Sequence, residues 1–193
     1  MLEEKIIEFC SPTLAGIKTG NLFSVKTEGK FIKEEIKKLN KILIKRGLRL
    51  IPLREKDGLT LIYLYRPRRL KCDFVRTENK KILEEKGYPC GNPDKCVVEL
   101  IRRLVADEKF PHEIGVFLGY PPSDVRGFMK SPCDGVKCVG CWKVYDNQQE
   151  AEKTFEKYKI CSSIYKKELS EGKTLESMIV DERRFTNSKA VNA

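Results

Sequence analysis

The sequence has a single histidine and a single tryptophan among its 193 residues, and it lacks any apolar run near the ~20 residues that span a bilayer. One histidine excludes a metal site built from several histidines of one chain, so imidazole acid–base chemistry would fall to His112. The sequence starts with an acidic amphipathic segment and not with the basic, then apolar pattern of a secretory signal. These absences predict a cytoplasmic protein without a transmembrane segment.

Several familiar signatures are missing as well. There is no Gly-x-Ser-x-Gly nucleophile elbow, and residues 11–21, although they contain glycine and lysine, lack the spacing of a phosphate-binding loop. An RNA-recognition signature and a zinc-finger spacing are also absent. Hydrolysis by a nucleophile elbow or a P-loop is therefore not expected.

What is present suits a globular protein with a charged surface. Hydrophobic residues make up 40% of the chain and charged residues 34%, and a single core usually organises roughly 100–200 residues. We expect one α+β domain over residues 1–180, followed by a frayed polar tail at 181–193. Of the net charge of +10, +5 lies in residues 31–49, which include a basic helix predicted for residues 31–46, and Arg66, Arg68, Arg69 and Lys71 form a second basic cluster. This charge permits binding to nucleic acid or to an acidic partner.

The pattern of apolar residues predicts a mostly helical α+β fold with a small antiparallel sheet of about three strands. Asp57-Gly58 lies between two apolar segments, 48–53 and 59–65, and is a strong hairpin signal. We expect 141–145 to join the same sheet, and a new short helix to start at Ser11-Pro12. Further helices are predicted at residues 2–9, 67–75, 77–86, 93–107, 112–118, 123–129 and 147–169, with a small element at 175–180.

The first candidate site is centred on the only histidine of the chain, His112. His112 can shuttle protons, with Glu113 or a more distant carboxylate fixing its tautomer, so His112 and Glu113 are the candidate catalytic residues. The alternative is that His112 starts a helix and hydrogen-bonds a buried backbone group. The rigid Gly119-Tyr-Pro-Pro turn presents Tyr120 and Asp124 beside it, an arrangement that suits ligand contact and equally suits a helix–helix corner.

The cysteines suggest a metal centre. Cys133-x4-Cys138-x2-Cys141 has the triplet spacing of plant-type [2Fe–2S] ferredoxins, and Cys161 can supply a fourth ligand. A zinc site with four sulfur ligands is the other option, with Cys90 and Cys96 as further thiolates. The alternative is a set of free thiols, because a chain with eight cysteines contains a Cys-x2-Cys pair by chance quite often.

Two further features are open to a functional or a structural interpretation. Thr13, Lys18 and Asn21 can contact an anion at a helix start, or they can cap the chain locally. The basic helix can follow a phosphate backbone, although few aromatic residues interleave with its charges. An acidic redox protein such as a flavodoxin or ferredoxin fits the charge equally well.

Several long stretches of the chain carry a family resemblance. They are residues 10–23, beginning Cys-Ser-Pro-Thr-Leu; residues 110–128, beginning Phe-Pro-His-Glu-Ile-Gly; Trp142-Lys-Val-Tyr145; and residues 155–161, followed later by Gly-Lys-Thr-Leu. Together they resemble an uncharacterised family found chiefly in clostridia and related anaerobes, domain-of-unknown-function family 3793. The resemblance spans about residues 2–180 and implies no particular reaction, but an anaerobic host suits thiol and iron–sulfur chemistry.

These observations favour a binding or accessory protein for a small ligand, a metal centre or an acidic redox partner in iron or electron metabolism. An enzyme that uses His112 and Glu113, with a thiol, is the second hypothesis, and a nucleic-acid-binding accessory protein is the third. We also expect the distinctive polar residues to line one concave surface. The residues predicted to bind the ligand are Thr13, Lys18, Asn21, His112, Tyr120, Asp124, Lys143 and Tyr145.

Overall fold

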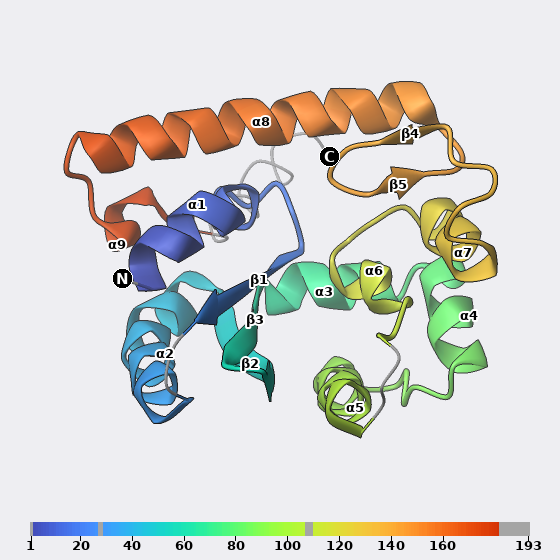
Figure 1. Cartoon of the computed structure of the whole chain (residues 1–193), viewed down its shortest axis with the longest axis horizontal. Coiled ribbons are helices and arrows are strands. Elements are labelled where there is room, and N and C mark those ends of the chain that lie inside the picture. The colour runs from blue at the N-terminus through green and yellow to red at the C-terminus, as the bar shows by residue number, and fades with distance from the viewer. Residues whose placement is uncertain (1, 27–28, 107–109, 182–193) are drawn as a thin grey trace, which may run out of the picture. The chain divides into compact units, whose positions relative to one another are not determined.

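A computed structural model describes residues 2–26, 29–106 and 110–181 (Figure 1). The chain divides into two compact units, one formed by residues 1–67 and 161–193 and the other by residues 68–160. Helices and two small antiparallel sheets make up the regular structure, which confirms the α+β class. In the described part of the chain, no helix is both long enough and apolar enough for a bilayer. The expected single domain stays a prediction, and the expected tail lies, apart from Asp181, outside the described residues.

The first unit contains a three-stranded antiparallel sheet in the order β1-β3-β2. Its strands are β1 (Gly20–Lys26), β2 (Arg49–Lys56) and β3 (Leu59–Tyr65). The predicted hairpin is confirmed, because β2 and β3 pair from Arg49 with Tyr65 to Lys56 with Leu59. Asp57 and Gly58 have φ angles of 51° and 71°, and two positive φ angles in succession are what a type I′ hairpin turn requires.

The prediction that residues 141–145 complete this sheet is wrong. The third strand is β1, which pairs with β3 from Gly20 with Tyr65 to Lys26 with Leu59. Glycine and asparagine at positions 16, 20 and 21 made this segment look irregular in the sequence, although Phe23 is buried and Ser24 exposed, as strand alternation requires. The segment after Trp142 forms β5 (Lys143–Val144), which pairs with β4 (Cys138–Val139) in a separate two-stranded sheet.

Helices α1 (Leu2–Leu14) and α2 (Gly29–Leu43) pack on the sheet of the first unit, with the short helices η1 (Ile44–Arg46) and α9 (Leu175–Met178) beside them. The predicted break at Ser11-Pro12 is wrong, since α1 continues through Pro12. The lost backbone donor of Pro12 is tolerated because the helix buries almost a whole face, and the Ser11 hydroxyl donates to the Ile7 carbonyl. The predicted basic helix is confirmed, and it stops at Gly47, which has a φ of 77°.

One hydrophobic core joins these elements. Ile62 and Leu64 of β3 belong to it, whereas Tyr63 and Tyr65 alternate to the opposite face of the strand and stack on each other at 4.6 Å. Most of the remaining core side chains come from one face each of α1 and α2 and from α9: Leu2, Ile6, Ile7, Cys10, Leu14, Ile32, Ile36, Leu39, Leu43, Leu175 and Met178. The spacing of these residues along α2 is the one from which the amphipathic helix was predicted.

Arg66 is the buried cation that fastens this unit together. Its side chain is fully buried, its Nε donates to the Thr13 carbonyl at 2.7 Å, and its Nη2 donates to the carbonyls of Leu14 (2.7 Å) and Val180 (2.8 Å). The last carbonyls of a helix lack partners within the helix and carry its negative dipole end. Arg66 therefore ties the end of β3 to the end of α1 and to the segment after α9.

The second unit contains α3 (Pro67–Phe74), α4 (Thr77–Glu85), α5 (Pro93–Ala106), α6 (Ile114–Phe117), α7 (Pro122–Lys130), the β4–β5 hairpin and the first part of α8 (Gln148–Ser170). The predicted helices of this region are confirmed, and the Asn92 side chain caps α5 by accepting from the backbone of Asp94 at 2.9 Å. Asn147 caps α8, since its side chain accepts from the backbone N–H of Glu150 at 3.1 Å.

We predict that Arg66→Met lowers the free energy of unfolding by roughly 2–4 kcal/mol, because two buried carbonyls and one partly buried carbonyl lose a charged donor. Urea unfolding followed by circular dichroism measures the change. The control is Arg68→Met, which removes an exposed guanidinium two residues away and should cost less than about 0.5 kcal/mol. Equal losses in the two variants would show that the buried hydrogen bonds of Arg66 contribute nothing of their own.

Candidate functional site

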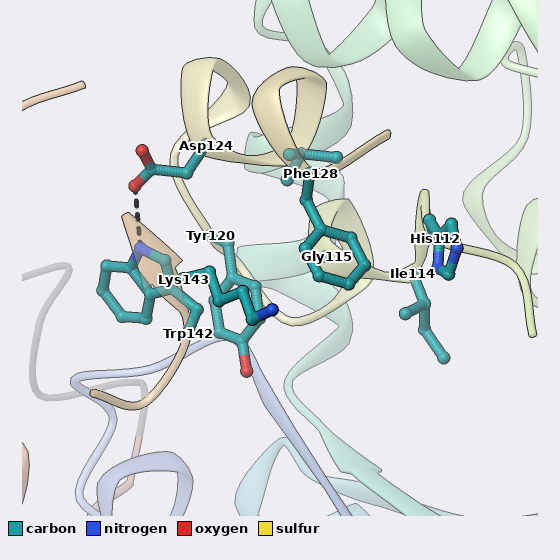
Figure 2. Close-up of a pocket in the computed structure, with 9 residues that line it drawn as sticks. His112, Ile114, Gly115, Tyr120, Asp124, Phe128, Trp142 and Lys143 are labelled. Carbon is teal, nitrogen blue, oxygen red and sulfur yellow. Dashed lines mark hydrogen bonds between the residues drawn. The ribbon is translucent and has the colours of Figure 1, made fainter. Parts of the chain in front are cut away.

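A pocket of about 190 Å³ lies in the second unit, between α6, α7 and the β4–β5 hairpin (Figure 2). Its walls are largely apolar, and its polar lining includes four of the residues predicted from the sequence to bind a ligand. The apolar lining comes from Ile114, Gly115, Val125, Phe128 and Trp142, and the four predicted residues are His112, Tyr120, Asp124 and Lys143. The Gly119-Tyr-Pro-Pro turn and the segment at Trp142, both singled out in the sequence, therefore contribute to the same pocket.

The carboxylate of Asp124 holds the pocket together. The residue is only 4% exposed, and its Oδ2 accepts from the indole Nε1 of Trp142 at 2.7 Å. Its Oδ1 accepts from the backbone N–H groups of Tyr145 (2.8 Å) and Asp146 (3.1 Å). Because three of roughly four acceptor positions are used, Asp124 orients the wall of the pocket and has little capacity left for a ligand.

Asp124 occupies its place for a local reason. It lies in the first turn of α7, two residues after Pro122, where a carboxylate is stabilised by the positive end of the helix. From that turn it reaches the chain just beyond β5. The predicted contact between Asp124 and a ligand is better described as the positioning of Trp142, which itself lines the pocket.

Two glycines let the hairpin pack this closely. A Cβ at Gly127 would lie 2.3 Å from a ring carbon of Tyr145, and a Cβ at Gly140 would lie 2.3 Å from ring carbons of Phe155. Any side chain at either position would push the hairpin away from its support. Tyr145, which was predicted to bind the ligand, packs against Gly127 and donates to the Ser131 carbonyl at 3.0 Å, so it lies outside the pocket lining.

The aromatic wall is rigid. The ring of Trp142 stacks on Tyr120 at 4.9 Å and meets Phe155 edge-on at 4.5 Å. The Tyr120 hydroxyl donates to the Cys141 carbonyl at 3.2 Å, and burial raises the pKa of that hydroxyl, so it stays a neutral donor at physiological pH. Trp142 is thus fixed by a stacking partner, an edge-on partner and a hydrogen bond to Asp124.

Two basic side chains lie at the edge of this wall. Figure 2 shows Lys143 and His112 on either side of Phe128. The Lys143 ammonium donates to the Pro132 carbonyl at 2.8 Å and lies 5.8 Å from the centroid of the Phe128 ring. The exposed imidazole of His112 meets the same ring edge-on at 4.9 Å. An anionic group in the pocket would therefore find donors on both sides of Phe128.

Glu113, the predicted acid–base partner of His112, belongs to a different network. Its side chain is buried, and its Oε1 accepts from the Tyr88 hydroxyl at 3.0 Å and from Arg103 Nη1 at 3.3 Å. Burial and the Glu113 carboxylate raise the pKa of Tyr88. Among the described residues no hydrogen bond joins His112 to Glu113, and both residues lie in the turn that precedes α6. Catalysis by this pair stays a prediction without support from the contacts.

The first of the stretches that carried the family resemblance, residues 10–23, lies in the first unit. The Thr13 hydroxyl donates to Asn21 Oδ1 at 2.7 Å, and Lys18, only 6% exposed, donates its backbone N–H to the Pro12 carbonyl at 3.0 Å. These bonds close the turn between α1 and β1, in agreement with the interpretation as local capping. The surface that these residues were expected to share with His112 stays a prediction, because His112 belongs to the other unit.

The cysteines predicted to bind an iron–sulfur cluster or zinc are dispersed. Cys133 and Cys141 are exposed and Cys138 lies in β4, whereas Cys161 is buried in the core of the first unit, where burial raises its pKa to about 11. Within residues 2–26, 29–106 and 110–181, no three His, Cys, Asp or Glu side chains are grouped so that they could hold a metal ion. The metal centre therefore gains no support from the geometry.

Sequence reasoning missed two aromatic walls of the pocket. Phe128 follows Asp124 by four residues on α7 and Trp142 immediately precedes Lys143, so each adjoins a residue that was predicted to bind a ligand. The i,i+4 relation within a predicted helix could have identified Phe128 as a neighbour of Asp124. The bond between Trp142 and Asp124 joins residues 18 positions apart, and no local rule predicts it.

We predict that Asp124→Asn destabilises the protein by roughly 1–3 kcal/mol, because an amide cannot accept all three hydrogen bonds. The emission of Trp142, the only tryptophan, should shift as the indole loses its acceptor. Asp146→Asn is the matched control, since Asp146 is exposed and contributes its backbone N–H to Asp124. An unchanged emission spectrum in Asp124→Asn would contradict the assigned role.

We also predict a loss of stability in acid that depends on Glu99. Hydrogen bonds from Arg102 and Arg103 lower the pKa of this carboxyl from 4.5 to about 2. A lowered folded-state pKa stabilises the fold above pH 4.5, and that contribution, about 1–2 kcal/mol after solvent screening, disappears as the pH falls towards 2. Urea unfolding from about pH 7 to about pH 2 should show a shallower decline for Glu99→Gln than for the exposed-site control Glu156→Gln. Parallel declines would contradict the prediction.

No curated protein and no solved structure matches the chain. One family model, described as "Protein of unknown function (DUF3793)", matches residues 6–179, a range that includes residues of both units and every residue of the pocket. The chain therefore belongs to the DUF3793 family of proteins of unknown function.

Proposed function

We propose that this protein binds a small molecule in the pocket between α6, α7 and the β4–β5 hairpin, and that the ligand is a single ring carrying an anionic group. The observation that carries the proposal is the preformed aromatic wall of Trp142, Tyr120 and Phe128 with a lysine at its edge. Largely apolar pockets with a few placed polar groups are the usual form of small-molecule sites.

The volume of the pocket limits the size of the ligand. An apolar cavity of about 150 Å³ holds one benzene molecule, so the 190 Å³ available here accommodates one ring and a small substituent. A dinucleotide or a flavin is far larger than this. The wall, held by Asp124 and Phe155, loses little entropy when a ring packs against it.

The charges at the pocket favour an anion. Lys143 has three donor protons and uses one on the Pro132 carbonyl. The carboxylate in the lining, Asp124, is directed to Trp142 and to backbone N–H groups. His112, exposed on the other side of Phe128, adds a second donor. A carboxylate on the ring is the simplest substituent that either basic group can bind.

Binding fits the lining better than catalysis does. The groups that face the pocket are aromatic rings, aliphatic side chains, one ammonium, one imidazole and the Asp124 carboxylate, which is engaged by Trp142 and by backbone N–H groups. Glu113 is engaged by Tyr88 and Arg103. An enzyme that uses His112 remains the second hypothesis, with a place for substrate beside the imidazole in its favour. A role in iron or electron metabolism and an acidic redox partner stay predictions from the sequence.

Benzoate is a suitable probe, because Trp142 lines the pocket and is the only tryptophan of the chain. We predict that benzoate changes the emission of Trp142 in a saturable way and that benzylamine, with the opposite charge on the same ring, binds at least about tenfold more weakly. Lys143→Met should remove most of that discrimination, because the stem is retained and the ammonium is lost.

The control is Lys130→Met, which removes an exposed ammonium from the end of α7 outside the pocket lining. It should leave the benzoate titration unchanged. Equal binding of benzoate and benzylamine to the wild type would overturn the choice of an anion. A tryptophan signal that responds to neither probe would overturn the proposed site for a single ring.

A further inference from the structure

A second hollow lies in the first unit, and its lining contains no aromatic residue. It is an open groove of about 460 Å³ between α2 and β2. Aliphatic side chains and Pro52 form its floor, and three lysines of α2 form one rim. The aliphatic residues are Ile36, Ile44, Leu50 and Ile51, and the lysines are Lys33, Lys37 and Lys41.

The lysine rim is a regular row of positive charge. Lys33, Lys37 and Lys41 follow one another at i,i+4 spacing, so they lie about 6 Å apart along the helix axis. All three are exposed, and within the described residues none of them has an ion pair. Glu35 of the same helix accepts from the backbone N–H of Leu2 at the start of α1, so it does not neutralise the row.

The floor of the groove selects for aliphatic partners. Ile44 is 56% exposed at the end of the groove, and its burial by a partner would remove apolar surface from water. Proteins that bind single-stranded nucleic acid stack its bases on aromatic rings, and no aromatic residue lines this groove. A chain with apolar side chains between its charges fits the floor better than a nucleic acid does.

The edge of β2 is closed to strand addition at the groove. Asn40 of α2 donates from Nδ2 to the Leu50 carbonyl at 2.7 Å, and its Oδ1 accepts from the Leu50 N–H at 3.0 Å. Two positions further on, Pro52 has no N–H to offer. The backbone groups that an added strand would use are therefore occupied or missing, and a partner has to dock through its side chains.

We propose that this groove binds an acidic amphipathic helix of a partner protein. Carboxylates at i,i+4 spacing on such a helix repeat every ~6 Å and match the lysine row, while aliphatic side chains on the adjacent face enter the floor. A second copy of the chain is a poor occupant, because two molecules of net charge +10 repel each other. This site lies in a different unit from the pocket at Trp142 and does not depend on it.

The test uses a synthetic helical peptide of about 16 residues, with glutamates at i, i+4 and i+8 and leucines on the neighbouring face. Fluorescence anisotropy of the labelled peptide should show saturable binding to the full chain. A peptide with lysine in place of each glutamate should not bind, and one with serine in place of each leucine should bind more weakly. Raising the salt concentration should weaken the first interaction, since exposed charges are screened.

The variants compare two sets of lysines that carry the same total charge. Lys33→Gln, Lys37→Gln and Lys41→Gln together should weaken binding about tenfold or more. Lys38→Gln, Lys45→Gln and Lys56→Gln, all exposed and outside the groove lining, should change it less than about twofold. Ile44→Ser alone should also weaken binding, and as an exposed position it leaves the fold intact.

Four outcomes would overturn the proposal. The peptide fails to bind the wild type, or the two lysine sets reduce its affinity equally. Alternatively, an oligothymidylate probe binds with the same dependence on Lys33, Lys37 and Lys41 while the acidic peptide does not, which would assign the groove to nucleic acid. Finally, sedimentation shows a dimer that dissociates when Ile44 is replaced by serine, which would assign the groove to a second copy.

Discussion

The second unit depends on one buried carboxylate with three donors. Asp124 is placed by the first turn of α7, and every group that it binds belongs to residues 142–146. A two-stranded hairpin as short as β4–β5 is not stable by itself in water, so these bonds, with the close contacts at Gly127 and Gly140, are what keep it folded. The pocket is the space left between α6, α7 and a hairpin that is held in this way.

Much of the site could be predicted from the sequence because it is local. His112, Tyr120 and Asp124 fall within thirteen consecutive positions around a rigid Gly-Tyr-Pro-Pro corner, and the structure places all three at the pocket. The partner chosen for His112 was the less reliable part, since Glu113 is adjacent in sequence but is turned to Tyr88 and Arg103. The donors that take the Glu113 carboxylate, Tyr88 and Arg103, lie 25 and 10 positions away in the sequence, so no local rule predicts them.

The fold shows the same limit. The hairpin at Asp57-Gly58 was predictable because two residues with positive φ determine it. The third strand was not predictable, because the pairing of β1 with β3 joins segments about 40 residues apart. Neither segment has a local feature that identifies the strand with which it pairs. Pro12 shows a related limit. Proline disfavours the interior of a helix, but the burial of Cys10, Ser11, Thr13 and Leu14 around it keeps α1 continuous.

The positively charged side chains are paired differently in the two units. In the second unit arginines are matched by carboxylates, as where Arg126 forms two 3.0 Å bonds to Glu85 and Arg103 binds Glu99 and Glu113. The exposed pair of Arg126 with Glu85 adds little stability, but together these ion pairs compensate much of the positive charge of the arginines. The row on α2 has no such partners among the described residues, and it borders an apolar groove. The net charge alone would predict a uniformly basic surface. The charge is instead unevenly distributed: in the unit that contains the Trp142 pocket arginines are paired with carboxylates, whereas the lysines of α2 are available to a partner.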